Sequence, residues 1–471
     1  MSLAIGNKTR TGNIDWITFS LYLSLILIGW IMIYAVGFNE KEPTAITDMS
    51  TSAGRQMMWV GVSLFIMFSV YVIDWKFWRT FSYSIYGISI VLLVLVLFLG
   101  TNINGATAWF SIGGFSFQPA EIAKFGTSLA LSNYMSAKSF RLAGTKNFFN
   151  IFLLLAIPIG LILWQPDAGS ALVFLSFFIL LYREGLSTVY YIIGGFLAAV
   201  FIGALLFDTL PIIMALILLC MLGLILTKEK KTYWLIAWSM LVILNIVAGI
   251  EDLYLVATIV DIVLFIAVAL LVSQRGEARL VMILTPALIV GSSLAFMANY
   301  AFNNFLATHQ QERINVWLHP DKCDPRGSLY NLLQSKMAIG SGGIAGKGFL
   351  EGNLTKLNYV PAQSTDFIFC TIGEEHGFIG VTIIIGLFVA LLIRLVIIAE
   401  RQRLHFVRNY AYCIAGIIFV HFFINIGMTM GLLPIIGIPL PFVSYGGSSI
   451  IGFTIMLAVL LKLDITRHGG Q

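Results

Sequence analysis

Residues 253–273 read LYLVATIVDIVLFIAVALLVS, an apolar run with a single charged residue, Asp261. A helix needs roughly 20 consecutive, mostly apolar residues to cross a bilayer, so this run predicts a membrane-spanning helix. The same criterion predicts about 14 spans in the whole chain. They are 16–37, 57–73, 80–99, 117–136, 148–164, 169–183, 188–207, 210–227, 232–250, 253–273, 280–301, 377–398, 409–430 and 446–463.

The composition agrees with a polytopic helical membrane protein. The 471 residues are 59% hydrophobic and 11% charged, with a mean hydropathy of +0.91, whereas an ordinary soluble domain is about 25% charged. The net charge of +5 is typical of basic cytoplasmic loops and does not indicate nucleic-acid binding. Because the bilayer is the solvent, the usual relation between length and domain number does not apply.

The basic residues predict the orientation of the spans, because cytoplasmic loops carry an excess of Lys and Arg. With the N-terminus inside, the inner side carries Lys8, Arg10, Lys76, Arg79, Lys138, Arg141, Lys146, Arg183, Lys228, Lys230, Lys231, Arg275, Arg279, Arg394, Arg401, Arg403, Arg408, Lys462 and Arg467. The short outer loops carry mainly Glu40, Glu42, Asp48, Asp167, Asp208, Glu251 and Asp252. Both termini are therefore predicted to be cytoplasmic and Asp366 to be outside. No small-residue cleavage site follows the first apolar run, which we expect to be a retained helix.

Three predicted outer segments are unusual. Residues 104–125 are rich in glycine and aromatic residues, and residues 430–449 contain three prolines. Residues 302–376 form a polar stretch with apolar anchors. Loops as long as residues 302–376 are usually functional or disordered. The aromatic residues of this loop favour an ordered, functional loop.

Asp366 lies in the long loop, directly before the apolar run 367–370. A carboxylate there is costly to bury unless it is paired or used. Ser364, Thr365 or Asp366 could cap the helix that begins near Phe367. Alternatively, Asp366 is a general base that deprotonates an attacking hydroxyl. Local chemistry leaves both interpretations open.

The surroundings of Asp366 favour glycosyl transfer from a lipid diphosphate over glycoside hydrolysis. Glycosidases need a second carboxyl group as an acid for a poor leaving group. A diphosphate needs cationic stabilisation instead, from lysines, arginines or a divalent cation. Lys336 and Lys347 flank a glycine-rich stretch, QSKMAIGSGGIAGKG at 334–348, whose backbone N–H groups could hold a phosphate. The stretch lacks the GKS/T of a P-loop, and taken alone it is typical of a flexible loop.

Three acidic residues near or within spans have a structural and a functional interpretation. Glu121 and Lys124 in QPAEIAKF are three positions apart and share a helix face, so they form either a structural pair or the border of a site for an anionic ligand. Asp167 follows Pro166 at a helix boundary and is expected to cap the next helix. Asp261 is an intramembrane acid, which is a functional candidate by default, but we expect it instead to be one half of a pair or a hydrogen-bond donor inside the bundle of extra helices.

Four cysteines, Cys220, Cys323, Cys370 and Cys413, have no metal-binding spacing. Cys323 and Cys370 both lie in the long polar region and could pair, although the sequence does not decide this.

Several strings resemble the SEDS family (shape, elongation, division and sporulation). They are GEEHGFIG after TDFIF, HPDKCDPRGSLYNLLQSKMAIGSGG in its elongation form, and above all LPIIGIPLPFVSYGGSS at 433–449. The resemblance covers about 1–190 and 300–471. It implies a peptidoglycan glycosyltransferase that polymerises lipid II on the outer face of the cytoplasmic (inner) membrane, paired with a class B penicillin-binding protein transpeptidase.

By this resemblance, Asp366 matches the family's essential aspartate, which deprotonates the GlcNAc 4-hydroxyl of the acceptor. That oxygen attacks MurNAc C1 of the donor, and undecaprenyl diphosphate leaves with inversion. The resemblance also places these residues on motifs around the cavity: Glu121, Lys124, Asp167, Gln334, Lys336, Lys347, Ser444, Tyr445, Gly446, Gly447 and Ser448. A metal site is not identified, and no cofactor is expected apart from a divalent cation.

The sequence departs from the family pattern at several positions. Ala362 and Ser364 replace a Glu and a His, Asn358 replaces an acid, and Ala108 replaces an Arg. The family usually has about ten spans, and residues 208–280 add roughly four, an even number that keeps Asp366 outside. The resulting single membrane domain comprises core helices at 16–207, an insertion at 208–280, the active-site loop at 302–376 and core helices at 377–471.

Two other functions fit parts of the same pattern. A lipid II flippase would need polar groups through the depth of the bundle, whereas here they gather on the predicted outer side. A non-catalytic scaffold would leave Asp366 among several lysines unexplained. The departures near Asp366 keep the scaffold in consideration.

Overall fold

The computed structural model describes residues 14–38, 45–103, 105–112, 115–137, 140, 142, 144–227, 231–274, 278–306, 308–324, 327–357 and 359–465. Some residues used above lie outside these ranges, namely Lys8, Arg10, Glu40, Glu42, Lys138, Arg141, Lys228, Lys230, Arg275, Asn358 and Arg467. The chain folds as two compact units, one made of residues 1–186 and 324–471 and the other of residues 187–323.

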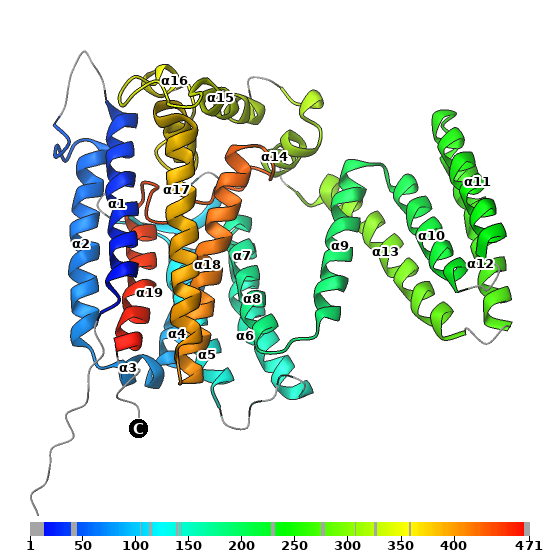
Figure 1. Ribbon diagram of the computed structural model, residues 1–471, viewed down its shortest axis with the longest axis horizontal. Helices are drawn as coiled ribbons and strands as arrows, with labels where there is room; N and C mark the ends of the chain where they lie inside the picture. Colours follow the sequence, from blue (N-terminus) through cyan, green and yellow to red (C-terminus); the bar gives the residue numbers. More distant parts are fainter. Residues whose placement is uncertain are drawn as a thin grey trace, which may run out of the picture. The chain divides into compact units, whose positions relative to one another are not determined.

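The first unit is a helical bundle with a small sheet (Figure 1). Its first segment contains α1 (Trp16–Gly37), α2 (Ser52–Val72), α3 (Trp75–Thr80), α4 (Ser82–Leu99), β1 (Thr101–Ile103), β2 (Ala106–Ile112), β3 (Phe115–Phe117), α5 (Pro119–Met135), α6 (Thr145–Trp164), α7 (Ala168–Val173), the 3₁₀ turn η1 (Phe174–Ser176) and α8 (Phe177–Arg183). Its second segment contains α15 (Ser328–Ser341), α16 (Asn353–Lys356), α17 (Ile368–Glu400), α18 (His405–Thr429) and α19 (Gly447–Ile465).

The second unit consists of helices in the described residues. They are α9 (Thr188–Leu206), α10 (Thr209–Leu226), α11 (Lys231–Ile250), α12 (Tyr254–Val272), α13 (Ala278–Asn304), α14 (Thr308–Leu318) and the 3₁₀ turn η3 (Pro320–Lys322). Asp261 of α12 is fully buried, and both its carboxylate oxygens accept hydrogen bonds from Asn245 of α11, at 3.1 and 3.0 Å. Asp261 is therefore hydrogen-bonded inside the extra helices, as expected, but as an acceptor and not as the expected donor. Residues 208–280 lie wholly within this unit.

The all-α polytopic architecture is confirmed, with two differences in the predicted spans. Twelve helices in the described residues are long and apolar enough to cross a membrane. The predicted span at 117–136 becomes α5, of only 17 residues, which begins with Pro119 in its first turn. The predicted span at 169–183 is interrupted by η1. In both segments apolar composition was a poor guide to the length of unbroken helix.

The short antiparallel sheet β1-β2-β3 was not predicted. It occupies most of the unusual segment before α5, with Phe110 opposite Phe117 and Thr101 opposite Trp109. The Thr107 N–H donates to the Gln165 carbonyl at 3.2 Å, which ties β2 to the end of α6. Ala108 in β2 is fully buried.

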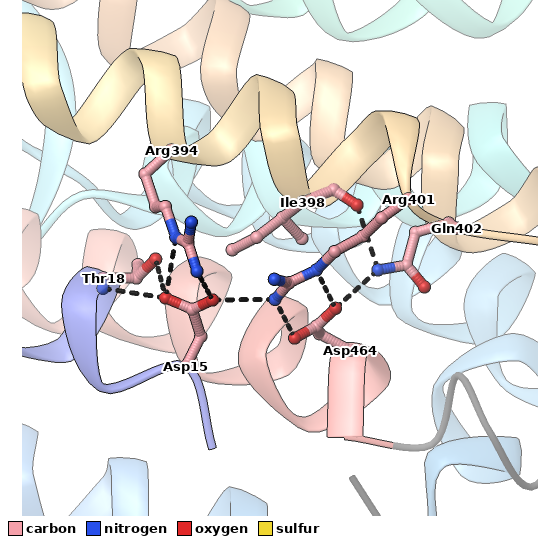
Figure 2. A network of polar contacts seen from close by, with 7 residues as sticks. All are labelled: Asp15, Thr18, Arg394, Ile398, Arg401, Gln402 and Asp464. Carbon is pink, nitrogen blue, oxygen red and sulfur yellow. Dashed lines mark hydrogen bonds and ion pairs between the residues drawn. The ribbon is translucent and has the colours of Figure 1, made fainter. Parts of the chain in front are cut away.

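An ion-pair network closes one end of the first unit by joining the start of α1 to the ends of α17 and α19 (Figure 2). Asp15 caps α1 by accepting from the Thr18 N–H at 3.0 Å. The same carboxylate pairs with Arg394 at 2.6 Å and Arg401 at 2.8 Å, and Arg401 also binds Asp464 bidentately. Removing one member of a buried pair typically costs about 3–5 kcal/mol, so this network stabilises the bundle end.

Candidate active site

Asp366 lies in a tight turn that precedes α17. Ala362 has a φ of 56°, and its carbonyl accepts from the N–H groups of Thr365 and Phe367 at 3.1 and 3.3 Å. The N-cap position of α17 is Phe367, so neither Asp366 nor the two residues before it occupies that position. Asp366 itself is only partly buried, as a side chain that meets a substrate must be.

A proline-rich segment at 430–446, which we call the strap, holds the turn of Asp366 by its main chain. The Ser444 hydroxyl donates to the Thr365 carbonyl at 2.5 Å, and the Tyr445 N–H donates to the Ser364 carbonyl at 2.8 Å. Asn425 of α18 donates both to the carbonyl of Asp366, at 2.8 Å, and to that of Ile438, at 2.7 Å. These bonds fix the backbone at Asp366.

Gly437 brings the strap against the carboxylate itself. Its φ is +78°, and a Cβ at this position would lie 3.3 Å from Oδ2 of Asp366. Only glycine adopts such a φ without steric cost. The close approach and the positive φ together explain why glycine stands here.

A second polar cluster borders the same strap at the start of α7. Asp167 caps α7 by accepting from the Ser170 N–H at 3.0 Å, as predicted. Gln118 donates to Asp167 at 2.7 Å, and the Gln118 N–H donates to the Ser448 hydroxyl at 3.1 Å. A Cβ on Gly169 would lie 3.2 Å from the Ile436 carbonyl oxygen, so this cluster abuts the strap.

The third cluster is buried within the bundle. Glu121 and Lys124 pair at 2.8 Å and are almost fully buried, which confirms that they form a pair. The Lys124 ammonium also lies 2.9 Å from Nε2 of His421, whose Nδ1 is 3.2 Å from the carbonyl oxygen of Pro439 in the strap. Oε2 of Glu121 is buried without a hydrogen-bond partner in the described part of the chain.

Sequence reasoning missed His421 and Asn425, which connect these clusters. They are four residues apart on α18 and therefore on one helix face. A histidine inside an apolar helix is a functional candidate by default, so the signal was available in the sequence. His421 links the buried pair to Pro439, Asn425 donates to Ile438, and Asp366 lies against Gly437. These three consecutive strap residues therefore connect the buried pair to Asp366.

Helix α15 brings Lys336 to the strap from another side. A Cβ on Gly431, whose φ is +76°, would lie 2.6 Å from the Lys336 ammonium nitrogen. The Ser335 hydroxyl donates to the Thr429 carbonyl at 3.0 Å, which fixes α15 to the end of α18. Gln334 is half-buried, and its Oε1 has no hydrogen-bond partner among the described residues.

Lys347 is paired within the protein. Its ammonium lies 2.6 Å from the fully buried carboxylate of Glu374. The N–H groups of Lys347 and Gly348 donate to the carbonyls of Glu374 and Glu375 at 3.1 and 3.0 Å. The glycine-rich stretch thus docks on the kink of α17 at Gly377, and these two N–H groups are not open to a phosphate.

Gly446 at the end of the strap and Gly447 at the start of α19 also have partners in the protein. The Gly446 N–H donates to Gln56 at 3.3 Å. A Cβ on Gly447 would lie 2.4 Å from the ring of Trp59, so glycine is required there for packing.

All four cysteines are free. Within the described ranges, no group of three or more His, Cys, Asp or Glu residues could hold a metal ion.

The sequence profile of the FtsW, RodA and SpoVE cell cycle proteins matches residues 15–211 and 204–469. The chain belongs to this family. Within the family, it is 30% identical to the peptidoglycan glycosyltransferase RodA of Treponema pallidum over 96% of this chain and 98% of that protein. It is 28% identical to the peptidoglycan glycosyltransferase MrdB of Escherichia coli K12, over 92% of this chain and 91% of that protein.

Solved structures support the same architecture. A peptidoglycan synthase complex, in which polymerisation and crosslinking are coordinated, contains a chain that aligns with a TM-score of 0.61 at 26% identity, covering 96% of this chain and 98% of that one. The rod-shape-determining protein RodA of Thermus thermophilus aligns with a TM-score of 0.55 at 23% identity, covering 96% and 97%. The chain is therefore an integral membrane protein with the family's fold.

Proposed function

We propose that this chain is a peptidoglycan glycosyltransferase that polymerises lipid II into glycan strands for cell elongation. The observation that carries the proposal is the turn of Asp366, which the strap fixes while the residue remains partly exposed. Lys336 lies over Gly431 of the same strap. A carboxylate base and a cation that both approach this strap suit a reaction that removes one proton from the acceptor and releases one diphosphate.

The reaction needs one proton transfer and one displacement. Asp366 takes the proton of the acceptor 4-hydroxyl, and the resulting oxygen forms a bond to C1 of the donor sugar. The bond between C1 and the diphosphate oxygen breaks, the configuration at C1 inverts, and undecaprenyl diphosphate leaves with the electron pair. Lys336 stabilises the negative charge of the leaving group. General-base catalysis of this kind contributes about 10²–10⁴-fold to the rate.

The other predicted residues position these groups or contact the lipid-linked sugars. We assign Glu121 and Lys124, through His421, to positioning the strap. Asp167, Gln334 and the segment from Ser444 to Ser448 border the substrate site. Lys347 orients the loop through Glu374. A divalent cation on the diphosphate remains part of the proposal, and no step depends on it.

The proposal includes the orientation and the partner. The basic residues of the described inner loops, such as Lys76, Arg79 and Arg403, support cytoplasmic termini and a site on the outer face. A class B penicillin-binding protein transpeptidase crosslinks the strands as they form. We also propose that residues 208–280 are an insertion into the family's core, and we assign no function to it.

The test is polymerisation of lipid II by purified protein, with and without a co-expressed class B transpeptidase. Asp366→Ala and Asp366→Asn are compared with wild type. Glu351→Gln is the matched control, because its carboxylate lies in the same loop and is 67% exposed. Strands from wild type and the control, with none from either Asp366 variant at equal folded yield, would support the proposal.

The two alternatives give different outcomes. A flippase would move lipid II across liposome bilayers without forming strands. A scaffold would do neither and would still bind the transpeptidase. Wild-type protein that forms no strands with its partner present would contradict the glycosyltransferase assignment.

A further inference from the structure

A pocket with two cations lies far from Asp366 along the bundle, at the junction of α3, α4 and α5. It is lined by Trp75, Lys76, Arg79, Thr80, Tyr83 and Asn133. Helix α3 lies at the opposite end of the first unit from α15 and α16 (Figure 1). The pocket therefore belongs to neither the strap nor the substrate site.

The position of α3 places the pocket at the edge of a bilayer. Helix α3 directly follows α2 and precedes α4, and both are long and apolar enough to span. The 21 residues of α2 give a length of about 30 Å, which matches the hydrocarbon core. Phe65, Phe68 and Val72 share one face of α2 and are 69–75% exposed, so a lipid-facing stripe runs to the end of α2 that adjoins α3.

Helix α3 has the residue pattern of an interfacial helix. Trp78 points inward and packs edge-on against Phe125 of α5, with ring centroids 6.0 Å apart. The rings of Phe77 and Phe81 pack at a tilt, with centroids 4.7 Å apart, and remain 39% and 45% exposed. Exposed phenylalanines are typical of the apolar face of an interfacial helix, and Trp75 and Tyr83 are of the type enriched at the level of lipid headgroups.

The cations of the pocket are not neutralised by ion pairs. Neither Lys76 nor Arg79 pairs with any acidic side chain in the described part of the chain. Asp74 is the nearby carboxylate, and it caps α3 by accepting from the Lys76 N–H at 2.9 Å. Lys462 adds a third cation at this end, where its ammonium donates to the Tyr71 carbonyl at 2.6 Å. The local charge is therefore positive.

The polar groups around these cations are held in place. Asn133 of α5 donates to the Ser82 hydroxyl at 2.8 Å and to the Arg79 carbonyl at 3.3 Å. These bonds fix the end of α3 against α5, so that the Arg79 guanidinium projects from a fixed backbone. A guanidinium can bind a phosphate through two parallel hydrogen bonds, while Lys76 acts as a point charge.

We propose that this pocket binds the phosphate diester of an anionic phospholipid from the leaflet next to α3. Lys76 and Arg79 hold the phosphate, Thr80 donates a hydroxyl, and Trp75 and Tyr83 flank the headgroup at the interface. The acyl chains lie against the exposed apolar side chains of α4, whose Tyr83 lines the pocket. Basic pockets between spanning helices on the cytoplasmic side are suited to such headgroups, and the predicted orientation places this pocket there.

The test is native mass spectrometry of the full-length protein in detergent, titrated with phosphatidylglycerol or with phosphatidylcholine. Wild-type protein is expected to retain phosphatidylglycerol in preference to phosphatidylcholine. The double variant Lys76→Gln/Arg79→Gln is expected to bind phosphatidylglycerol about 30-fold more weakly, on the scale of two surface cations. The charge-preserving exchange Lys76→Arg/Arg79→Lys is expected to keep the preference and controls for folding.

A charge-matched control separates the pocket from general electrostatics. Arg55 and Arg403 are exposed and outside the pocket, and Arg55→Gln/Arg403→Gln removes the same charge. Equal loss of binding in this control and in the pocket variant would overturn the proposal, as would undiminished binding in the pocket variant. Displacement of phosphatidylglycerol by an equal concentration of inorganic phosphate would assign the pocket to free anions instead of lipid.

Discussion

Replacing Gly437 with alanine tests whether the strap positions Asp366. The backbone at Gly437 has a φ of +78°, where a residue with a Cβ costs about 1–2 kcal/mol. The new Cβ would stand 3.3 Å from Oδ2 of Asp366, which requires a shift of a few tenths of an ångström. Since a misplacement of 1 Å costs roughly 100-fold in rate, we expect about a tenfold loss of polymerisation.

Gly185→Ala is the matched control for backbone strain. Gly185 has a φ of +97°, and a Cβ there would meet no atom within 4 Å. Both variants are therefore expected to lose similar stability, measured by thermal unfolding in detergent. Only Gly437→Ala is expected to lose polymerisation at equal folded yield. Equal activity of the two variants would refute the claim that the strap sets the position of Asp366.

Three further predictions concern stability. Lys124→Met leaves the Glu121 carboxylate buried and unpaired, so this variant is expected to lower the unfolding free energy by about 3–5 kcal/mol. The double variant Lys124→Met/Glu121→Gln is expected to recover part of this loss. A double variant less stable than Lys124→Met would contradict the assignment of a buried ion pair. Gly447→Ala drives a Cβ to 2.4 Å from the Trp59 ring, so its folded yield on size-exclusion chromatography is expected to collapse. Burial raises the pKa of Asp15, but hydrogen bonds from Arg394, Thr18 and Arg401 together outweigh it and hold the pKa well below its usual value. The Asp15 carboxylate therefore contributes stability above about pH 4 that is lost on further acidification, and wild type is expected to lose more thermal stability between about pH 5 and pH 3 than Asp15→Asn does.

Local patterns were sufficient for much of the fold. Apolar runs predicted the spanning helices because in a bilayer the backbone must satisfy its own hydrogen bonds. The spacing of Glu121 and Lys124 predicted a shared helix face, and the position of Asp167 before Gly169 and Ser170 predicted a cap; both features are present. These features depend on neighbours within four residues.

What the sequence did not predict depends on contacts between distant residues. Lys124 and His421 are 297 positions apart, and nothing in either local sequence names the other as a partner. Strands β1 and β3 have only three residues each, and the seven residues of β2, ATAWFSI, do not alternate strictly between apolar and polar. The main-chain bonds from the strap to the turn of Asp366 carry no side-chain signature at the accepting residues, so only the fold reveals them.

The central claim is that Asp366 is the general base. The most direct measurement compares Asp366→Asn with wild type in two assays, equilibrium binding of lipid II and its polymerisation with the transpeptidase present. The account predicts binding within about threefold of wild type and a rate lower by about 10²–10⁴-fold. Polymerisation by Asp366→Asn at the wild-type rate would contradict it and move the base to another residue.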